Sequence, residues 1–285
     1  MAKKIIRTGL KGCFLIKSDK ILYLKVVKTT MIFVEYFLWL IVYSFIGWIY
    51  ESIICSAGEK RLVNRGFLNG PVCPVYGFGA LTCIFFLNQK IDNVALLFFL
   101  GMLLTCAVEY ITSVLLEKLF NTKWWDYSNH RFNIQGRVSL LGAIVFGTFS
   151  VLLIKYVHPF IRELIGRLPD PVLITASLAL SLILMLDLYV TVRHILLLNS
   201  RLQEIQAAIN SFLEQRTKRA GEIKATLLNR FEESEFYNGR IKDLLRANLY
   251  QSTRLLRAFP KSRSVKYNEA WQKLKSILLD ADDID

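Results

Sequence analysis

Long apolar runs dominate this sequence, and they constrain its fold more than any other feature. Hydrophobic residues make up 53% of the 285-residue chain and aromatic residues 13%. A bilayer core is crossed by about 20 residues of helix, so runs of this length are typical of membrane spans rather than buried strands. We expect an all-α fold: a polytopic transmembrane helical bundle over residues 31–198 with a cytoplasmic helical C-terminal tail. The predicted spans are residues 32–55, 70–88, 94–116, 138–157 and 172–198.

Two stretches interrupt the apolar pattern. The apolar part of the second run, Pro74 to Leu87, is about 14 residues long, which also fits a re-entrant or interfacial segment. Adding residues 69–73 lengthens it to about 19 residues, and on that ground a full span is preferred. A stretch that contains proline and arginine, residues 158–171, is predicted to be the loop between the last two spans.

The basic residues predict the orientation of the chain. Residues 1–30 form a leader with eight Lys or Arg and one acidic residue, and residues 199–285 form a basic tail. Because Lys and Arg favour the cytoplasmic side, two basic ends conflict with five spans. A start at Met31 removes this conflict and places the tail in the cytoplasm. If the leader is genuine, four spans with a re-entrant second segment are the alternative.

The tail alternates charged residues with apolar residues at helical spacing. Leu202, Ile205 and Ile209 share one helical face, and a similar run follows a predicted turn at Asn238. A shorter amphipathic segment, from about 265 to 279, precedes an acidic tip. We therefore expect two amphipathic helices and a short third one, rather than a single coiled coil.

The formal net charge of +13 is typical of nucleic-acid-binding proteins. Here, however, the basic residues lie in the leader, the loops and the tail, where the positive-inside bias and anionic lipid account for them. The expected partner is the lipid bilayer, and no nucleic acid is expected. The five cysteines form no CxxC pair and the three histidines have no metal-ligand spacing, so no metal site and no cofactor is predicted.

Several ionisable residues lie inside or at the ends of the predicted spans, and four of them are candidates for a functional role. A charge near the bilayer centre costs at least about 2.5 kcal/mol, so such residues are kept where they are paired, hydrated or functional. The candidates are Glu51, Glu109, Asp187 and His194. Two interpretations stay open: these side chains line a substrate pathway, or the carboxylates join neighbouring helices through hydrogen bonds and ion pairs.

A first loop motif, from Asn64 to Gly77, combines Gly, Pro and Asn with aromatic residues at a membrane entry. This composition predicts irregular backbone, which at membrane depth needs internal hydrogen-bond partners or a wet cavity. An ordinary turn is the alternative. The residues that define the motif are Gly66, Gly70, Pro71, Cys73, Pro74, Tyr76 and Gly77.

A second loop motif precedes the fourth span. It runs from Trp124 to Arg137 and includes Trp125, Tyr127 and Gly136. Trp and Tyr favour the headgroup region, so an interfacial aromatic belt is one interpretation. The other is a polar cluster at the cytoplasmic mouth of the bundle. Its candidate members are Arg65, Asn69, Asp126, Asn133 and Arg137, together with Glu51.

These two motifs, with the run from Gly47 to Glu51, resemble the bacterial ABC-transporter type IV (CmpB-like) integral membrane protein family. The resemblance covers about residues 31–200 and implies a permease-like component that works with a separate ATPase subunit. The chain has no Walker A phosphate loop, so any nucleotide would be bound by that partner. Five spans are few for a transporter, so a homo- or hetero-oligomer is expected.

Two other functions fit the same residues. A membrane scaffold or sensor would recruit partners through the C-terminal tail. A membrane-embedded enzyme would act on a lipid or polyprenyl carrier at the cytoplasmic face. The residues that would handle its phosphate headgroup are Glu51, Asp126, Arg65 and Arg137. Because the sequence contains no recognisable catalytic motif, an enzyme is not expected.

Overall fold

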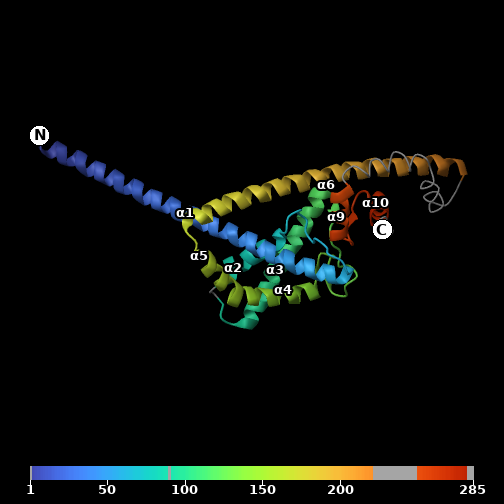
Figure 1. The fold of residues 1–285 in the computed structure, drawn as a ribbon, viewed down its shortest axis with the longest axis horizontal. Helices are drawn as coiled ribbons and strands as arrows, with labels where there is room; N and C mark the ends of the chain where they lie inside the picture. Colours follow the sequence, from blue (N-terminus) through green and yellow to red (C-terminus); the bar gives the residue numbers. More distant parts are fainter. Residues whose placement is uncertain (1, 89–90, 221–248, 281–285) are drawn as a thin grey trace.

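A computed structural model describes residues 2–88, 91–220 and 249–280 (Figure 1). Nearly all of this chain is helical, and the four strands are two residues long each, so the predicted all-α class is confirmed. The helices are α1 (Ala2–Glu59), α2 (Pro74–Leu87), α3 (Val94–Phe120), α4 (Leu140–Leu152), the π-helix η1 (Leu153–Val157), α5 (His158–Gly166), α6 (Asp170–Ala220), α9 (Leu249–Ala258) and α10 (Asn268–Asp280). The strands are β1 (Thr122–Lys123), β2 (Asn133–Ile134), β3 (Val138–Ser139) and β4 (Arg263–Ser264).

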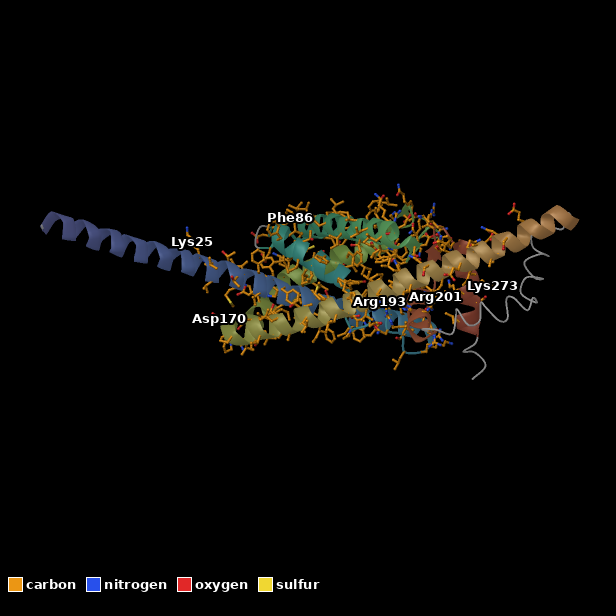
Figure 2. All side chains as sticks on the ribbon, turned by 90° about the horizontal axis from the view of Figure 1, so that it is seen from above. Lys25, Phe86, Asp170, Arg193, Arg201 and Lys273 are labelled. Atoms are coloured by element: carbon orange, nitrogen blue, oxygen red, sulfur yellow. The ribbon has the colours of Figure 1, made fainter. Side chains whose placement is uncertain are left out.

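Within the described residues, four helices are long and apolar enough to cross a membrane. They are Lys25–Gly58, Val94–Phe120, Leu140–Gly166 and Asp170–Ser211. Large apolar side chains such as Phe33, Leu103 and Leu182 are more than 60% exposed on them, as expected of surfaces that face lipid. Figure 2 shows carbon-only side chains over much of these helices, with nitrogen-tipped ones around Arg201 and Lys273. The chain is a multi-pass membrane protein.

The prediction of a loop at residues 158–171 is wrong for most of that stretch. α4, η1 and α5 follow one another without a break, and only residues 167–169 connect α5 to α6. In η1 the His158 N–H donates to the Leu153 carbonyl, five residues earlier. Proline normally breaks a helix because it lacks the N–H and its ring clashes with the preceding turn. The wider π turn relieves this crowding just before Pro159, so the helix continues.

α6 does not end at the predicted boundary between residues 198 and 199. It continues as one helix to Ala220, so the last predicted span and the first tail helix are the same element. Its apolar face beyond the membrane part packs on the short C-terminal helix, which the sequence also predicted. The buried residues of this contact are Leu198, Leu202, Ile205 and Ile209 on α6 and Trp271, Leu274 and Leu278 on α10. The amphipathic run predicted after Asn238 begins outside the described residues.

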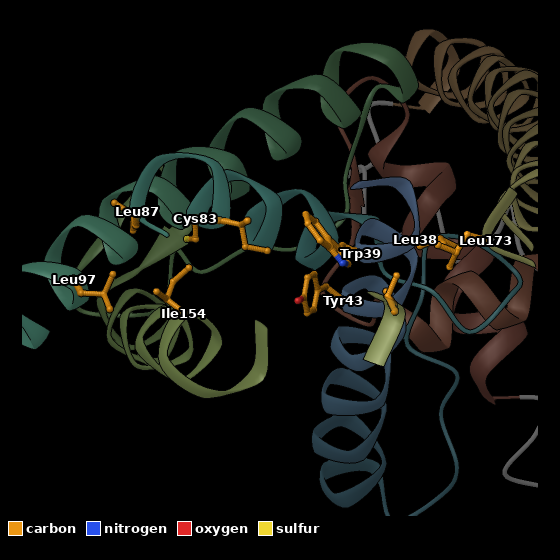
Figure 3. Close-up of a cluster of buried hydrophobic side chains, with 10 residues drawn as sticks. Leu38, Trp39, Tyr43, Cys83, Leu87, Leu97, Ile154 and Leu173 are labelled. Carbon is orange, nitrogen blue, oxygen red and sulfur yellow. The ribbon is translucent and has the colours of Figure 1, made fainter. Parts of the chain in front are cut away.

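The core of the membrane part is a cluster of buried side chains shared by all its helices (Figure 3). α1 contributes an aromatic edge, and α2 and α3 contribute small and aliphatic residues that fit against it. The buried members are Leu38, Trp39, Tyr43, Cys83, Ile84, Leu87, Leu97, Ile154, Ile165 and Leu173. This packing joins α1 to α2 and holds η1 and α5 against both.

The segment between α1 and α2 turns back along α1 before α2 begins. The Arg65 N–H donates to the Ser52 hydroxyl at 3.3 Å and the Cys73 N–H donates to the Ser44 carbonyl at 2.9 Å. α2 therefore starts beside Ser44, about 22 Å of helix before the end of α1 at Glu59. Residues 70–73 are not helical, so the expected extension of α2 back to residue 70 is wrong. A full crossing by residues 70–88 stays a prediction.

One end of the bundle carries the C-terminal helices, and we call it the tail end. Here the loops at residues 60–73 and 121–139 meet α9, β4 and α10. Strand β1 pairs with β4, with Thr122 opposite Ser264, and Arg254 on α9 reaches the first loop. At the opposite end of the bundle, Lys155 in η1 donates to the Ile91 carbonyl. That the tail end faces the cytoplasm stays a prediction.

Candidate functional site

A cavity of about 300 Å³ lies between α1, α2, α3 and the helix formed by α4 and η1. Its wall is aliphatic and aromatic except for a few hydroxyl, thiol and carboxyl groups. The short side chains of Gly79 and Ala80 on α2 leave room opposite the rings on α1 and α4. Glu109 on α3 supplies the single carboxylate of the lining. An apolar pocket with a few polar groups is typical of a small-molecule site.

Glu109 is 8% exposed and keeps one free acceptor. Its Oε2 atom has no hydrogen-bond partner within the described chain, and none of the ion pairs found there includes it. The Tyr127 hydroxyl forms a hydrogen bond with the carboxylate. Burial, followed by the negative charges of Glu109 and Glu51, raises the pKa of Tyr127, so this phenol stays protonated. Leaving a buried acceptor unpaired is costly, which marks Oε2 as a position for a ligand.

Four aromatic rings form one wall of the cavity. The ring centroids of Tyr50 and Phe149 are 4.9 Å apart and those of Tyr76 and Phe146 are 5.9 Å apart, both edge to face. Tyr50 and Tyr76 join the two pairs at 6.1 Å. The rings come from α1, α2 and α4, so the wall exists only in the packed bundle.

The cavity meets a charged network toward the tail end. The Tyr76 hydroxyl donates to Glu51 Oε1 at 2.5 Å, and Arg65 Nε lies 3.3 Å from Glu51 Oε2. The Arg65 guanidinium also donates to the Ala258 carbonyl and lies over the Phe259 ring, 4.7 Å from its centroid. Two of the predicted cluster residues, Glu51 and Arg65, are therefore brought together, and Arg65 ties them to α9.

Asp187 does not line the cavity. Its Oδ1 accepts from the Asn69 N–H and from Asn69 Nδ2, both at 2.9 Å, and its Oδ2 accepts from the Gly70 N–H at 2.7 Å. Thr191 donates to Oδ1 as well, at 3.2 Å. A Cβ on Gly70 would approach the carboxylate to 3.1 Å, so glycine permits this contact. Asp187 supplies the internal partners that the irregular backbone was predicted to need.

The carbonyl groups of the same loop are bound from the tail. The Arg254 guanidinium donates to the carbonyls of Gly66 and Leu68 at 2.9 Å and to that of Phe67 at 3.2 Å. The Cys73 thiol donates to the Arg65 carbonyl at 3.0 Å. Burial raises the pKa of this thiol to about 12, helped by the charge of Glu51.

The first loop motif ends in α2. Pro71 lies in the turn before it, Pro74 occupies the first turn, where a missing N–H is harmless, and Gly77 brings α2 against the backbone of α1 at Leu40.

In the second loop motif, Asn133 and Arg137 find their partners within the loop and on α3, whereas Tyr127 reaches toward Glu109 and the charges of Glu51 and Arg65. Asn133 Oδ1 accepts the Gly136 N–H at 2.8 Å, and Gly136 has φ +69°, the left-handed region that glycine tolerates. Trp125 Nε1 donates to the Arg137 carbonyl, and the Arg137 side chain pairs with Glu117 at 2.6 Å. The single polar cluster is thus resolved into two separate ion pairs, Glu51 with Arg65 and Glu117 with Arg137.

Asp126 links this loop to the tail. Its side chain accepts from Ser128 and lies 3.0 Å from Arg263, next to β4. Partial burial acts against the charged form, but the Ser128 hydrogen bonds and the charges of Arg263 and Lys123 outweigh it and lower the pKa of Asp126. Trp124, 3% exposed, packs against the rings of Phe259 and Trp271. This part of the motif is a docking surface for the C-terminal helices.

His194 lies away from the cavity as well. Its Nε2 atom is 3.3 Å from the Ser252 hydroxyl on α9, so it joins α6 to the tail. Within the described residues, no group of three or more His, Cys, Asp or Glu side chains could hold a metal ion. Of the four pathway candidates, only Glu109 lines the cavity, with Glu51 one hydrogen bond away through Tyr76.

The aromatic wall was missed by the sequence reasoning. Tyr43, Gly47 and Tyr50 recur at four- and three-residue spacing, and Phe146 and Phe149 are three residues apart, so each pair of rings shares one helical face. That spacing is the signal that could have found the wall. The Tyr43 hydroxyl and His158 Nδ1 are also hydrogen-bonded, 2.9 Å apart, in a buried contact between α1 and α5. The spacing of the histidines in the sequence did not predict this contact.

Comparison with known proteins gives one finding. No curated protein and no solved structure matches the chain. One family model, described as "Putative ABC-transporter type IV", matches residues 38–192. That range contains every residue that lines the cavity, together with Glu51, Arg65 and Asp187, and it ends before the tail helices. The resemblance predicted from the two loop motifs is confirmed, and the chain belongs to this ABC-transporter type IV family.

Proposed function

We propose that the chain is the permease-like membrane component of a transport system driven by a separate ATPase, and that the Glu109 cavity is its substrate-binding site. The observation that carries the proposal is that Glu109 lines an apolar cavity between membrane helices while its buried Oε2 atom has no hydrogen-bond partner among the described residues. A buried polar group of this kind inside a membrane protein is a functional-site candidate by default.

The other carboxylates support the choice of Glu109. Asp187 has four hydrogen bonds from the loop and from Thr191, and Glu51 is held by Arg65 and Tyr76. Both carboxylates have protein partners that account for their retention, whereas Glu109 lacks a partner on one oxygen.

The ATPase would be a separate subunit that binds at the tail end of the bundle, on the cytoplasmic side of a bacterial plasma membrane. The family description supports a partner of this kind, and the chain carries no phosphate loop of its own. A second copy or a second membrane subunit would complete the path, because so few helices enclose only a small cavity.

The contacts of two arginines weigh against an enzyme acting on phosphate headgroups. Arg65 is engaged by Glu51 and the Ala258 carbonyl, and Arg137 by Glu117 and the Ser113 hydroxyl. Binding a phosphate would require breaking these partly buried pairs, which leaves carboxylates uncompensated.

The test compares Glu109→Gln with Glu35→Gln in a deletion strain. Glu35 is a half-buried carboxylate on a membrane helix that does not line the cavity. We expect Glu109→Gln to abolish complementation while protein level and the co-purifying ATPase stay at wild-type amounts, and Glu35→Gln to complement. Full complementation by Glu109→Gln, or the absence of an ATPase from mild-detergent pull-downs of the wild type, would refute the proposal.

A further inference from the structure

The ligand of the cavity can be described by chemical class from the groups that face it. The wall offers aliphatic side chains, five aromatic rings, a few hydroxyl and thiol groups and one carboxylate. Each of these groups restricts what can bind. The inference rests on the proposed function, because it names the substrate class of the same site.

The charge balance of the cavity excludes an anion and disfavours a neutral hydrocarbon. Glu109 takes part in none of the ion pairs found among the described residues, and the charge that acts on its carboxyl group is that of another carboxylate, Glu51. Arg65 is already paired with Glu51. An anionic ligand would be repelled, and an apolar one would leave Glu109 Oε2 without a partner. A cation that carries an N–H group would satisfy both the charge and the free acceptor.

The aromatic wall favours the same ligand. The faces of Tyr and Phe rings carry negative potential, and rings that surround a cavity are a known means of binding organic ammonium groups. Neighbouring ring centroids along the wall are 4.9 Å apart for Phe149 and Tyr50, 6.1 Å for Tyr50 and Tyr76, and 5.9 Å for Tyr76 and Phe146. The remaining lining, such as Ile46 on α1, is aliphatic and suits an apolar body.

We propose that the cavity binds an organic ammonium cation with an apolar body, its nitrogen paired with the Glu109 carboxylate. The body lies among the rings of α1, α2 and α4. A cavity of about 300 Å³ is at the small end of ligand sites, so the ligand is a small amphiphilic amine and not a lipid with two acyl chains.

The first experiment needs no variant. The full-length protein is purified in mild detergent and titrated calorimetrically with 2-phenylethylammonium and with propylbenzene, which has the same shape but a methyl group in place of the ammonium. We expect saturable binding of the ammonium and at least about tenfold weaker binding of propylbenzene. Equal affinity for the two probes, or no binding of the ammonium, would overturn the proposal.

The second experiment assigns the site. Glu109→Gln should weaken 2-phenylethylammonium binding at least about tenfold and leave propylbenzene unchanged, because only the charge is removed. Phe149→Leu should weaken ammonium binding by about three- to tenfold. Glu35→Gln should bind as the wild type does. Unchanged ammonium affinity in a Glu109→Gln protein that elutes and melts like the wild type would refute the assignment.

These titrations use the chain without an ATPase, so they separate the two proposals. Ammonium binding that depends on Glu109, in a protein whose Glu109→Gln variant still complements the deletion strain, would retain the ligand class and reject the transport role. If the Glu109→Gln variant fails to complement the deletion strain but the wild-type protein does not bind 2-phenylethylammonium, the transport role would be retained and the ligand class rejected.

Discussion

The replacement Asp187→Asn is expected to destabilise the protein rather than to block a substrate path. In the wild type, Oδ1 accepts three hydrogen bonds, from Asn69 N, Asn69 Nδ2 and Thr191, and Oδ2 accepts one, from Gly70 N. An asparagine amide has only one acceptor oxygen. If that oxygen takes the Oδ1 position, its NH₂ group faces the Gly70 N–H, donor against donor.

The magnitude follows from these contacts. One charge-assisted hydrogen bond is lost, worth about 1.5–3 kcal/mol, and the part-buried Gly70 N–H is left without its acceptor. The three bonds at Oδ1 remain but lose the help of the charge. Because the side chain is only half-buried, water offsets part of these costs, and we expect the free energy of unfolding to fall by about 3 kcal/mol. For a domain of this size that corresponds to a fall of about 6–12 °C in Tm.

The assay is a thermal melt of detergent-purified protein, followed by tryptophan fluorescence. Asp92→Asn is the matched control, because Asp92 is exposed and its pair with Lys155 is at the 4.0 Å limit, so its Tm should not change measurably. A variant Asp187→Asn with wild-type Tm and no complementation of the deletion strain would refute the reasoning, and would return Asp187 to the candidates for the substrate pathway.

Two further predictions concern the attachment of the tail. Arg254→Gln should speed labelling of Cys73 by N-ethylmaleimide at pH 8, because the carbonyls of residues 66–68 lose the guanidinium that binds them and the buried thiol, whose pKa is about 12, becomes accessible. The exposed control Lys261→Gln should label at the wild-type rate. Equal labelling rates in the two variants would show that Arg254 does not hold the loop in place. The pKa of Asp126 is lower in the folded protein, so its stabilisation is present above the ordinary Asp value near 4 and lost as pH falls through the folded value. The difference in Tm between wild type and Asp126→Asn should therefore shrink steadily as the pH falls below about 4, and a difference that does not shrink on acidification would show that the pair with Arg263 is not its source.

Length and hydropathy were sufficient to predict the helical membrane fold, because a bilayer permits few alternatives. The helix ends were less predictable. Pro159 was interpreted as part of a loop, since local sequence does not show that a π turn will make room for it. The end of the last span at residue 198 was placed by a change in composition, but a helix can continue across such a change when one apolar face follows another, as Leu198 and Leu202 do.

The candidate site was predicted only in part. Glu109 could be identified because a carboxylate inside an apolar run is conspicuous in any sequence. The sequence could not predict that Asp187 would lie outside the cavity, because both carboxylates lie within apolar runs. Only tertiary packing brings the N–H groups of Asn69 and Gly70 to Asp187. Likewise, the sequence grouped Glu51 with both Arg65 and Arg137 in one polar cluster, and the packing of residues 60–73 along α1 brings only Arg65 of the two into an ion pair with it among the described residues.

The first loop motif is held from two sides, and this affects how the tail can be tested. Asp187 on α6 binds N–H groups of the loop, and Arg254 on α9 binds its carbonyls. The loop leads directly into α2, whose Tyr76 lines the cavity. Truncation of the tail would therefore disturb the membrane site even if the tail recruited nothing. A scaffold role can be separated from this effect only by changing exposed tail residues, such as Lys261, while Arg254 keeps its contacts.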